Sequence, residues 1–117
     1  MDSRYLQQFK KGSLEMVLLS ILSKGETYGY EIMSQLNTRG GEIFGNAKEG
    51  TVYPLLYRLQ DAQLIQCRLV AGQGGASRKY YSLTPRGRET YAQLQAFWRE
   101  YVRCVEGFLT MEGEGEG

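Results

Sequence analysis

The spacing of hydrophobic residues along the chain changes once, from a helical period to the period of a strand. In the first half, hydrophobic residues recur every three or four positions, which predicts three helices with one buried face each. Their buried positions are Leu14, Val17, Leu18, Ile21 and Leu22, then Ile32, Met33 and Leu36, then Val52, Leu55, Leu56 and Leu59. The segments Leu64–Val70 and Arg78–Thr84 alternate instead, with the glycine-rich AGQGGAS between them. This alternation predicts a β-hairpin.

The helix ends are less strongly marked than the helix interiors. The first helix should end near Lys24–Gly25, and Thr27 is the candidate N-cap of the second helix. The stretch NTRGGEIFGN is expected to be a polar connector. The third helix has two alternative starts: Asn46, which could form a capping box with Glu49, or Thr51, which would place Pro54 in the first turn.

A long final helix is predicted from Pro85 to about Met111, because Thr84 can cap it and proline suits the first helical position. Three helices, a hairpin and a long helix predict a mostly helical α+β fold, the winged helix-turn-helix. In that fold the third helix can enter the major groove of DNA. We divide the chain into a winged helix-turn-helix DNA-binding domain (1–84), a C-terminal dimerisation helix (85–111) and a disordered acidic tail (112–117).

The charge is unevenly distributed, although the net charge of the 117 residues is only +1. Residues 1–47 are balanced, residues 48–88 carry +5, and residues 89–117 carry −4. The local field, rather than the total charge, decides whether a surface attracts a polyanion. The third predicted helix and the hairpin are therefore the candidate DNA-binding face.

Polar groups on these two elements suit DNA. Off the buried stripe of the third helix lie Lys48, Thr51, Tyr53, Tyr57 and Arg58. Such groups can donate to phosphates and base edges, although a helix face that meets only solvent is the alternative. On the hairpin, Arg78 and Lys79 adjoin the turn and favour phosphate contacts. Tyr81 and Leu83 are expected to pack on the helices, and Tyr80 is left undecided.

The final helix carries more apolar surface than one small domain can cover. Tyr91, Leu94, Trp98, Tyr101, Val105 and Phe108 form one seam, and Leu94, Phe97, Tyr101, Cys104, Phe108 and Met111 form another. A helix of about 27 residues would be about 40 Å long, so a second copy of the chain is the simplest partner. Trp98 could also line a pocket for a planar apolar ligand, with dimer packing alone as the alternative.

Composition argues against several classes of protein. The chain has no histidine and two cysteines, so neither a metal site nor a cofactor is expected. Nucleotide-binding and hydrolase motifs are missing, which argues against an enzyme. No apolar run is long enough to span a bilayer, and the N-terminus lacks the apolar core of a signal peptide. We therefore expect a cytoplasmic protein with no membrane partner.

Two motifs resemble those of the PadR family of bacterial transcription regulators. EGTVYPLLYRLQDAQLI is similar to that family's Gly-Thr-Leu-Tyr-Pro and Arg-Leu-Glu pattern, and SRKYYSLTPRGRE is similar to its Arg-Lys-Tyr-Tyr-x-Leu-Thr wing. KGSLEMVLLSILSKGETYGYEIMSQL resembles the first two helices, with Tyr28 in place of a usual histidine. Gln60, Gln63 and Ala76 depart from the pattern, and Gln63 stands where a glycine often ends the recognition helix.

The resemblance implies a homodimeric regulator, usually a repressor, that binds a roughly palindromic operator and releases it when an effector binds. The compact subfamily with one C-terminal helix includes multidrug-sensing members, in which a tryptophan of that helix forms an aromatic slot. The effector residues implied for this chain are Trp98, Met16 and Ser20. The DNA-binding residues that we assign are Tyr28, Tyr30, Lys48, Thr51, Tyr53, Arg58, Ser77, Arg78 and Lys79.

The hypothesis is therefore a PadR-like regulator of transcription that binds double-stranded DNA as a homodimer, with a planar aromatic molecule as a candidate effector. The alternative is a winged-helix module that binds proteins or small molecules without binding DNA. The operator, the target gene, the identity of any effector and the choice between repression and activation do not follow from the sequence.

Overall fold

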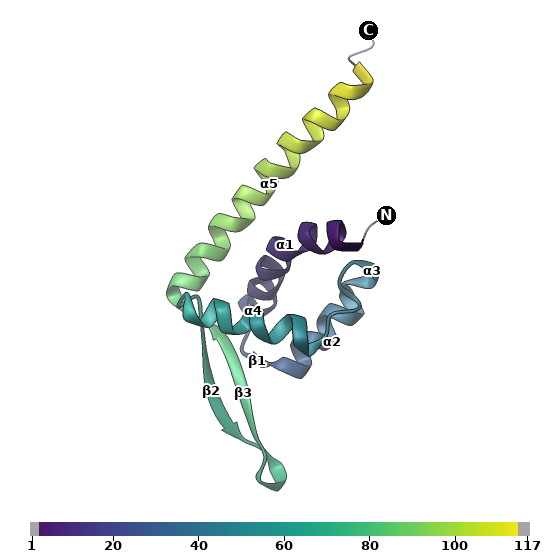
Figure 1. The fold of residues 1–117 in the computed structure, drawn as a ribbon. Helices are drawn as coiled ribbons and strands as arrows, with labels where there is room; N and C mark the ends of the chain where they lie inside the picture. Colours follow the sequence, from purple (N-terminus) through teal and green to yellow (C-terminus); the bar gives the residue numbers. More distant parts are fainter. Residues whose placement is uncertain (1–2, 115–117) are drawn as a thin grey trace.

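The computed structural model describes residues 3–114, and residues 1–2 and 115–117 lie outside the described part. The elements in chain order are α1 (Ser3–Ser23), β1 (Thr27–Tyr28), α2 (Gly29–Arg39), α3 (Gly41–Phe44), α4 (Glu49–Asp61), β2 (Ile65–Ala71), the 3-10 turn η1 (Gln73–Gly75), β3 (Ser77–Leu83) and α5 (Pro85–Glu114). Figure 1 shows α1 to α4 gathered in one body, with the β2–β3 hairpin projecting on one side and α5 extending away on the other. This is the winged helix-turn-helix arrangement that the hydrophobic pattern predicts.

One hydrophobic core joins the helices to the base of the hairpin. Most of the expected stripes of α1 and α4 lie in it, and Ile32 and Leu36 of α2 complete the helical part. Leu19, which was not expected there, is also buried, whereas Val17 and Met33 are only partly buried. Ile65 of β2 and Tyr81 and Leu83 of β3 close the core from the sheet, which confirms that these two β3 side chains pack on the helices. Burying such side chains is the main source of the fold's stability, and it fixes the orientation of α4 relative to the hairpin.

The sheet has three strands rather than two. Its order is β1-β3-β2, and both pairings are antiparallel. Thr27 and Tyr28 pair with Tyr81 and Tyr80, so the expectation that Thr27 caps the second helix was wrong. The residue before α2 is Tyr28, which makes no side-chain capping bond. The strand forms because the long β3 offers an unpaired edge to this extended segment.

Two further helix boundaries differ from the sequence prediction. The expected connector contains the short helix α3. Helix α4 is preceded by Lys48, so neither Asn46 nor Thr51 is its N-cap. Pro54 consequently lies inside α4, where it removes a helical hydrogen bond to the carbonyl of Gly50. Both Gly50 and Pro54 are exposed, and water can satisfy that carbonyl.

The junction between α4, β2 and α5 is closely packed. Helix α4 ends in a Schellman motif, in which the amide of Leu64 donates to the carbonyl of Leu59 at 3.0 Å and the amide of Gln63 donates to that of Gln60 at 2.9 Å. Gln63 has a φ of 63°, the left-handed conformation that glycine usually supplies. The hydroxyl of Thr84 accepts from the amide of Gly87 at 2.9 Å, which confirms Thr84 as the cap of α5.

Helix α5 packs on α1 and β3 near its start and then leaves the core. It gives the molecule extents of 68 × 32 × 22 Å. The helix continues past Met111 to Glu114, so residues 112–114 are helical where disorder was expected. Residues 115–117 of the expected tail lie outside the described residues. The division into domains at residue 84 stays a prediction.

Candidate nucleic-acid interface

Helix α4 presents a narrow exposed face between two edges. Residues at its centre are Gly50, Pro54 and Tyr57, all exposed. Thr51 and Arg58 share one edge, because seven residues make nearly two turns. This edge faces α1, where Glu15 pairs with Arg58. Lys48 lies exposed immediately before the first turn. A hydroxyl and a phenol are thus available on α4, with an ammonium group on the residue before it.

Tyr53, predicted to contact DNA, lies on the opposite edge of α4 and is half-buried. Its phenol lies directly against Gly29 at the start of α2, where a side chain larger than hydrogen would collide with it. The rings of Tyr53 and Tyr57 are 6.3 Å apart. The structure therefore gives Tyr53 a packing role between α4 and α2. Tyr57, which was not among the assigned site residues, holds the more exposed position.

Arg58 has a partner within the fold. Its guanidinium Nη1 lies 3.2 Å from Oε1 of Glu15 on α1. The arginine side chain is still 64% exposed, so the pair is a surface ion pair of small stabilising effect. The structure thus separates Arg58, held toward α1, from the cations of the wing.

The wing carries its cations near the hairpin tip. Arg78 pairs with Val70, Lys79 with Leu69, and Ser77 with Ala71, and the three β3 residues are exposed. The Arg78 guanidinium lies 4.7 Å from the ring centre of Tyr28, and the Lys79 ammonium lies 5.8 Å from that of Tyr57. These cation–π contacts link one wing cation to β1 and the other to α4.

Tyrosines also mark the edge of the interface at α2. The rings of Tyr28 and Tyr80 are 5.3 Å apart, so Tyr80, left undecided by the sequence, packs against β1. Tyr30, in the first turn of α2, is 71% exposed. Tyr28 is half-buried beneath the Arg78 side chain. Tyr30, two residues later in the chain, extends into solvent. The two tyrosines, both assigned to DNA binding, therefore have different surroundings.

A second wing arginine is neutralised. Arg68 of β2 donates to both carboxylate oxygens of Glu26, from Nε at 2.7 Å and from Nη2 at 2.6 Å. The hydrogen bonds from Arg68 hold the pKa of the Glu26 carboxyl below its usual value. The two residues are 42 positions apart in the chain, and their pairing could not be foreseen from local pattern.

Tyr81 lies beneath this interface and is buried. Burial raises the pKa of its phenol to about 12 because the interior disfavours the phenolate. Among the described residues, its hydroxyl has no hydrogen-bond partner. Tyr81 serves the interface by packing, since it fixes β3 against the helices.

The three residues assigned to an effector line one cavity. Met16 and Ser20 of α1 and Trp98 of α5 surround a space of about 210 Å³, together with Val17, Tyr91, Gln95 and Arg99. The rings of Trp98 and Tyr101 are nearly parallel, at 20° with centres 6.4 Å apart. Trp98 is 44% exposed in the single chain, so its open side can meet a ligand or a partner subunit.

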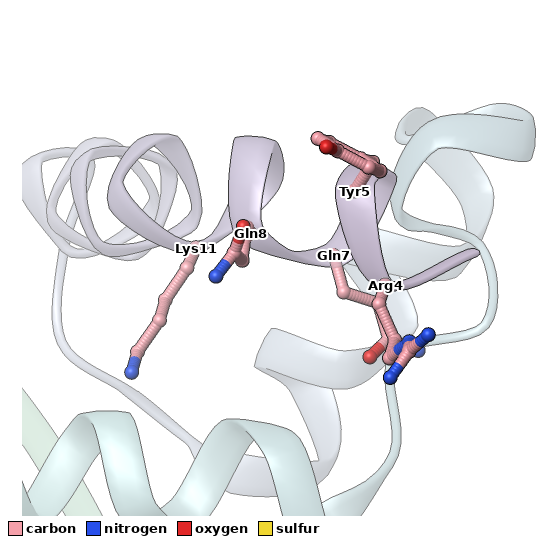
Figure 2. Close-up of a pocket in the computed structure, with 5 residues that line it drawn as sticks. All are labelled: Arg4, Tyr5, Gln7, Gln8 and Lys11. Carbon is pink, nitrogen blue, oxygen red and sulfur yellow. The ribbon is translucent and has the colours of Figure 1, made fainter. Parts of the chain in front are cut away.

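Other hollows border α1: one of about 220 Å³ shares Val17 and Ser20 with the cavity beside Trp98, and two larger ones lie along the N-terminal half of the helix. One of about 540 Å³ is lined by Arg4, Tyr5, Gln7, Gln8 and Lys11. In Figure 2 the Tyr5 side chain points to the opposite side of the helix from Arg4 and Lys11, so the lining does not converge on one point. The other, of about 560 Å³, lies between α1, α3 and α4 and reaches Thr51. None of the other assigned residues lines either hollow.

Comparison with known proteins decides the family. The family model described as "Transcriptional regulator PadR-like family" matches residues 18–93, more than half of the chain. The chain belongs to the PadR-like family. The resemblance noted in the sequence is thereby confirmed.

Relatives of this PadR-like chain include proteins of similar and of greater length. An uncharacterized protein of Lysinibacillus sphaericus is 30% identical over 103 residues, which are 88% of this chain and 92% of that protein. The negative transcriptional regulator PadR of Bacillus subtilis is 34% identical over 76 residues, 65% of this chain. The match spans only 41% of that longer regulator.

Solved structures support the same fold. A PadR-like transcriptional regulator of Bacillus cereus has a TM-score of 0.75 and 39% identity, covering 87% of this chain and 96% of its own. Bacillus subtilis PadR in complex with operator DNA has a TM-score of 0.64 and 32% identity, covering 70% of this chain and 46% of its own. This PadR-like chain therefore shares its winged-helix fold with a DNA-bound regulator.

The described part of the chain offers neither a membrane-spanning helix nor a cluster of metal ligands. Its helices are all too short or too polar to cross a membrane. Among residues 3–114, no three His, Cys, Asp or Glu side chains come together in a way that could hold a metal ion.

Proposed function

We propose that this PadR-like regulator binds double-stranded operator DNA as a homodimer, with α4 in the major groove and the wing on the phosphate backbone. The observation that carries the proposal is the similarity to Bacillus subtilis PadR, whose solved structure is a complex with operator DNA. The exposed groups of α4 suit base edges and phosphates, and the wing cations suit phosphates. Regulation of transcription would place the protein in the cytoplasm.

The dimer follows from the unpartnered apolar face of α5. Phe97, Trp98, Tyr101, Phe108 and Leu109 are each at least 44% exposed in the single chain. An apolar surface of this kind on a helix that leaves the core needs a partner. A second copy would bury it and would supply two recognition helices, which matches a roughly palindromic operator.

The effector hypothesis rests on the cavity beside Trp98. Its lining combines flat aromatic rings with the polar groups of Ser20, Gln95 and Arg99. A planar aromatic molecule could stack on Trp98, and the partner subunit would close the open side. Because α1 belongs to the DNA-binding domain and α5 to the dimer, a ligand held between them could change the spacing of the recognition helices.

The test replaces both wing cations, Arg78→Ala with Lys79→Ala, and measures binding of random and selected duplexes by fluorescence anisotropy across a salt series. We expect weaker binding to every duplex, and the slope of log K against log salt should shrink by about 0.9 for each lost phosphate contact. The matched control removes two cations at the base of the hairpin, Arg86→Ala with Arg88→Ala. It should change the slope much less.

Two outcomes would contradict the proposal. If the wild-type protein binds duplex DNA no better than an acidic control protein at low salt, the chain does not bind DNA. A module for proteins or small molecules would then be the better explanation. If DNA binding is strong but both double variants behave alike, DNA is the ligand but the wing cations do not contact it.

A further inference from the structure

The ion pair between Glu26 and Arg68 ties the hairpin to the turn that follows α1. Glu26 stands after Gly25, whose φ of 151° turns the chain out of α1, and Arg68 lies in β2. Two of the three guanidinium nitrogens donate to the carboxylate, Nη2 at 2.6 Å and Nε at 2.7 Å. This two-bond geometry is the strong form of a carboxylate–arginine contact, and it directs the Nε–Nη2 edge of the guanidinium at Glu26 and fixes its orientation.

Stability of the fold does not account for this pair. The Arg68 side chain is 65% exposed and that of Glu26 is 31% exposed, and neither residue belongs to the hydrophobic core. Ion pairs at such positions contribute little to stability, because solvent screens them and two long side chains must be ordered. The effect of the pair should therefore be sought in the charge that the wing presents.

Arg68 lies beside the wing cations. Its partner across the sheet is Tyr80, and Arg78 lies two residues further along the same face of β3. Diagonal neighbours of this kind are about 7–8 Å apart. Arg78 in turn lies over Tyr28, two residues after Glu26 in the chain. One face of the sheet thus holds two arginines, and a single carboxylate engages one of them.

We propose that Glu26 limits the grip of the wing on DNA: it holds Arg68 away from phosphates and leaves Arg78 and Lys79 as the wing's phosphate contacts. The inference rests on the proposed function. Each phosphate contact adds affinity for any duplex without reading sequence. A regulator that must leave its operator when an effector binds is released more easily if one phosphate contact is absent, because its affinity for DNA is then lower. Glu26 is accordingly a positioning residue that acts through Arg68.

The sign of the mutational effect tests this role. In Glu26→Gln the guanidinium of Arg68 is released, so binding to random duplex should become about fourfold tighter near 200 mM salt, and the salt slope should steepen by about 0.9. In Arg68→Gln an uncompensated carboxylate faces the phosphates, so binding to every duplex should weaken. The double variant, Glu26→Gln with Arg68→Gln, is neutral at both positions and should return close to wild type.

The control is Glu89→Gln, which removes the same charge from the exposed face of α5 at the base of the hairpin. It should leave the salt slope unchanged. If Glu26→Gln weakens binding and the double variant matches Arg68→Gln, then Arg68 contacts DNA directly and the inference is overturned. If Glu26→Gln behaves as Glu89→Gln does, the inference also fails while the proposed function stands. If the wild-type protein binds no duplex, both the proposed function and the inference that rests on it fail.

Discussion

The left-handed residue at the end of α4 offers a sharp test of how this helix is terminated. Gln63 has a φ of 63° and occupies the Schellman position, where its amide and that of Leu64 satisfy the last carbonyls of α4. Side chains with a Cβ pay about 1–2 kcal/mol for this conformation, which glycine adopts without penalty. The Gln63 side chain is exposed, so its removal sacrifices no buried contact.

Gln63→Gly should therefore stabilise the protein. Relief of the left-handed conformation contributes about 1–2 kcal/mol, and the greater freedom of glycine in the unfolded chain cancels about 0.5–1 kcal/mol of it. The expected net gain in the free energy of unfolding is about 1 kcal/mol. The carbonyl of residue 63, which accepts from the Thr84 hydroxyl at 2.7 Å, is part of the backbone and is retained.

The assay is urea unfolding followed by circular dichroism, at one protein concentration because a dimer's stability depends on it. Gln93→Gly is the matched control: the same substitution at an exposed site inside α5, where it should cost about 1 kcal/mol. The two variants should thus shift stability in opposite directions. Equal losses in both would refute the reasoning, because position 63 would then behave as an ordinary helical site.

Two other predictions concern buried and half-exposed aromatic residues. Tyr81→Phe removes a buried hydroxyl that lacks a partner among the described residues, and it should raise the free energy of unfolding by about 1 kcal/mol. Because folding raises the Tyr81 pKa from 10.0 to about 12, the unfolded phenol ionises first and wild-type stability should fall as pH rises through this range. If Tyr81→Phe loses stability just as steeply as the wild type over this pH range, Tyr81 is not the cause of the loss. Trp98→Ala should weaken binding of a planar aromatic dye about tenfold, as expected for a lost stacking contact. Calorimetry measures this, and unchanged affinity would remove Trp98 from the effector site.

Local signals in the sequence were sufficient for the elements that local forces determine. The three helical stripes and the alternating hairpin each follow from which side chains must face the core. The start of α5 follows from a hydroxyl and a proline in adjacent positions. β1 could not be found this way. It consists of Thr27 and Tyr28 alone, and it is a strand only because β3, more than fifty residues later, offers it an edge.

For the candidate site too, the sequence indicates the residue types but not the contacts that form only in the folded chain. The sequence supplied residue types that suit DNA, and the family resemblance supplied Trp98, Met16 and Ser20. These three meet at one cavity because α1 packs against α5. Neither source could say which polar groups find partners inside the fold. For Tyr53, nothing in the neighbouring sequence reveals that Gly29 leaves space for its phenol, and its contact with DNA stays a prediction.

Those internal partners change the electrostatic description of the DNA-binding face. The charge of +5 over residues 48–88 counts Arg58 and Arg68, yet each is engaged by a glutamate from outside that segment, Glu15 and Glu26. Of the other five cations of this segment, Lys48 lies before the first turn of α4, two lie on the wing and two lie in the first turn of α5. The exposed face of α4 lies between Lys48 and the wing cation Lys79, whose ammonium is 5.8 Å from the ring centre of Tyr57. Phosphate contacts fix register and base contacts carry sequence choice. We therefore expect Lys48 and the wing cations to hold α4 near its two ends, and the central side chains of α4 to discriminate between sequences.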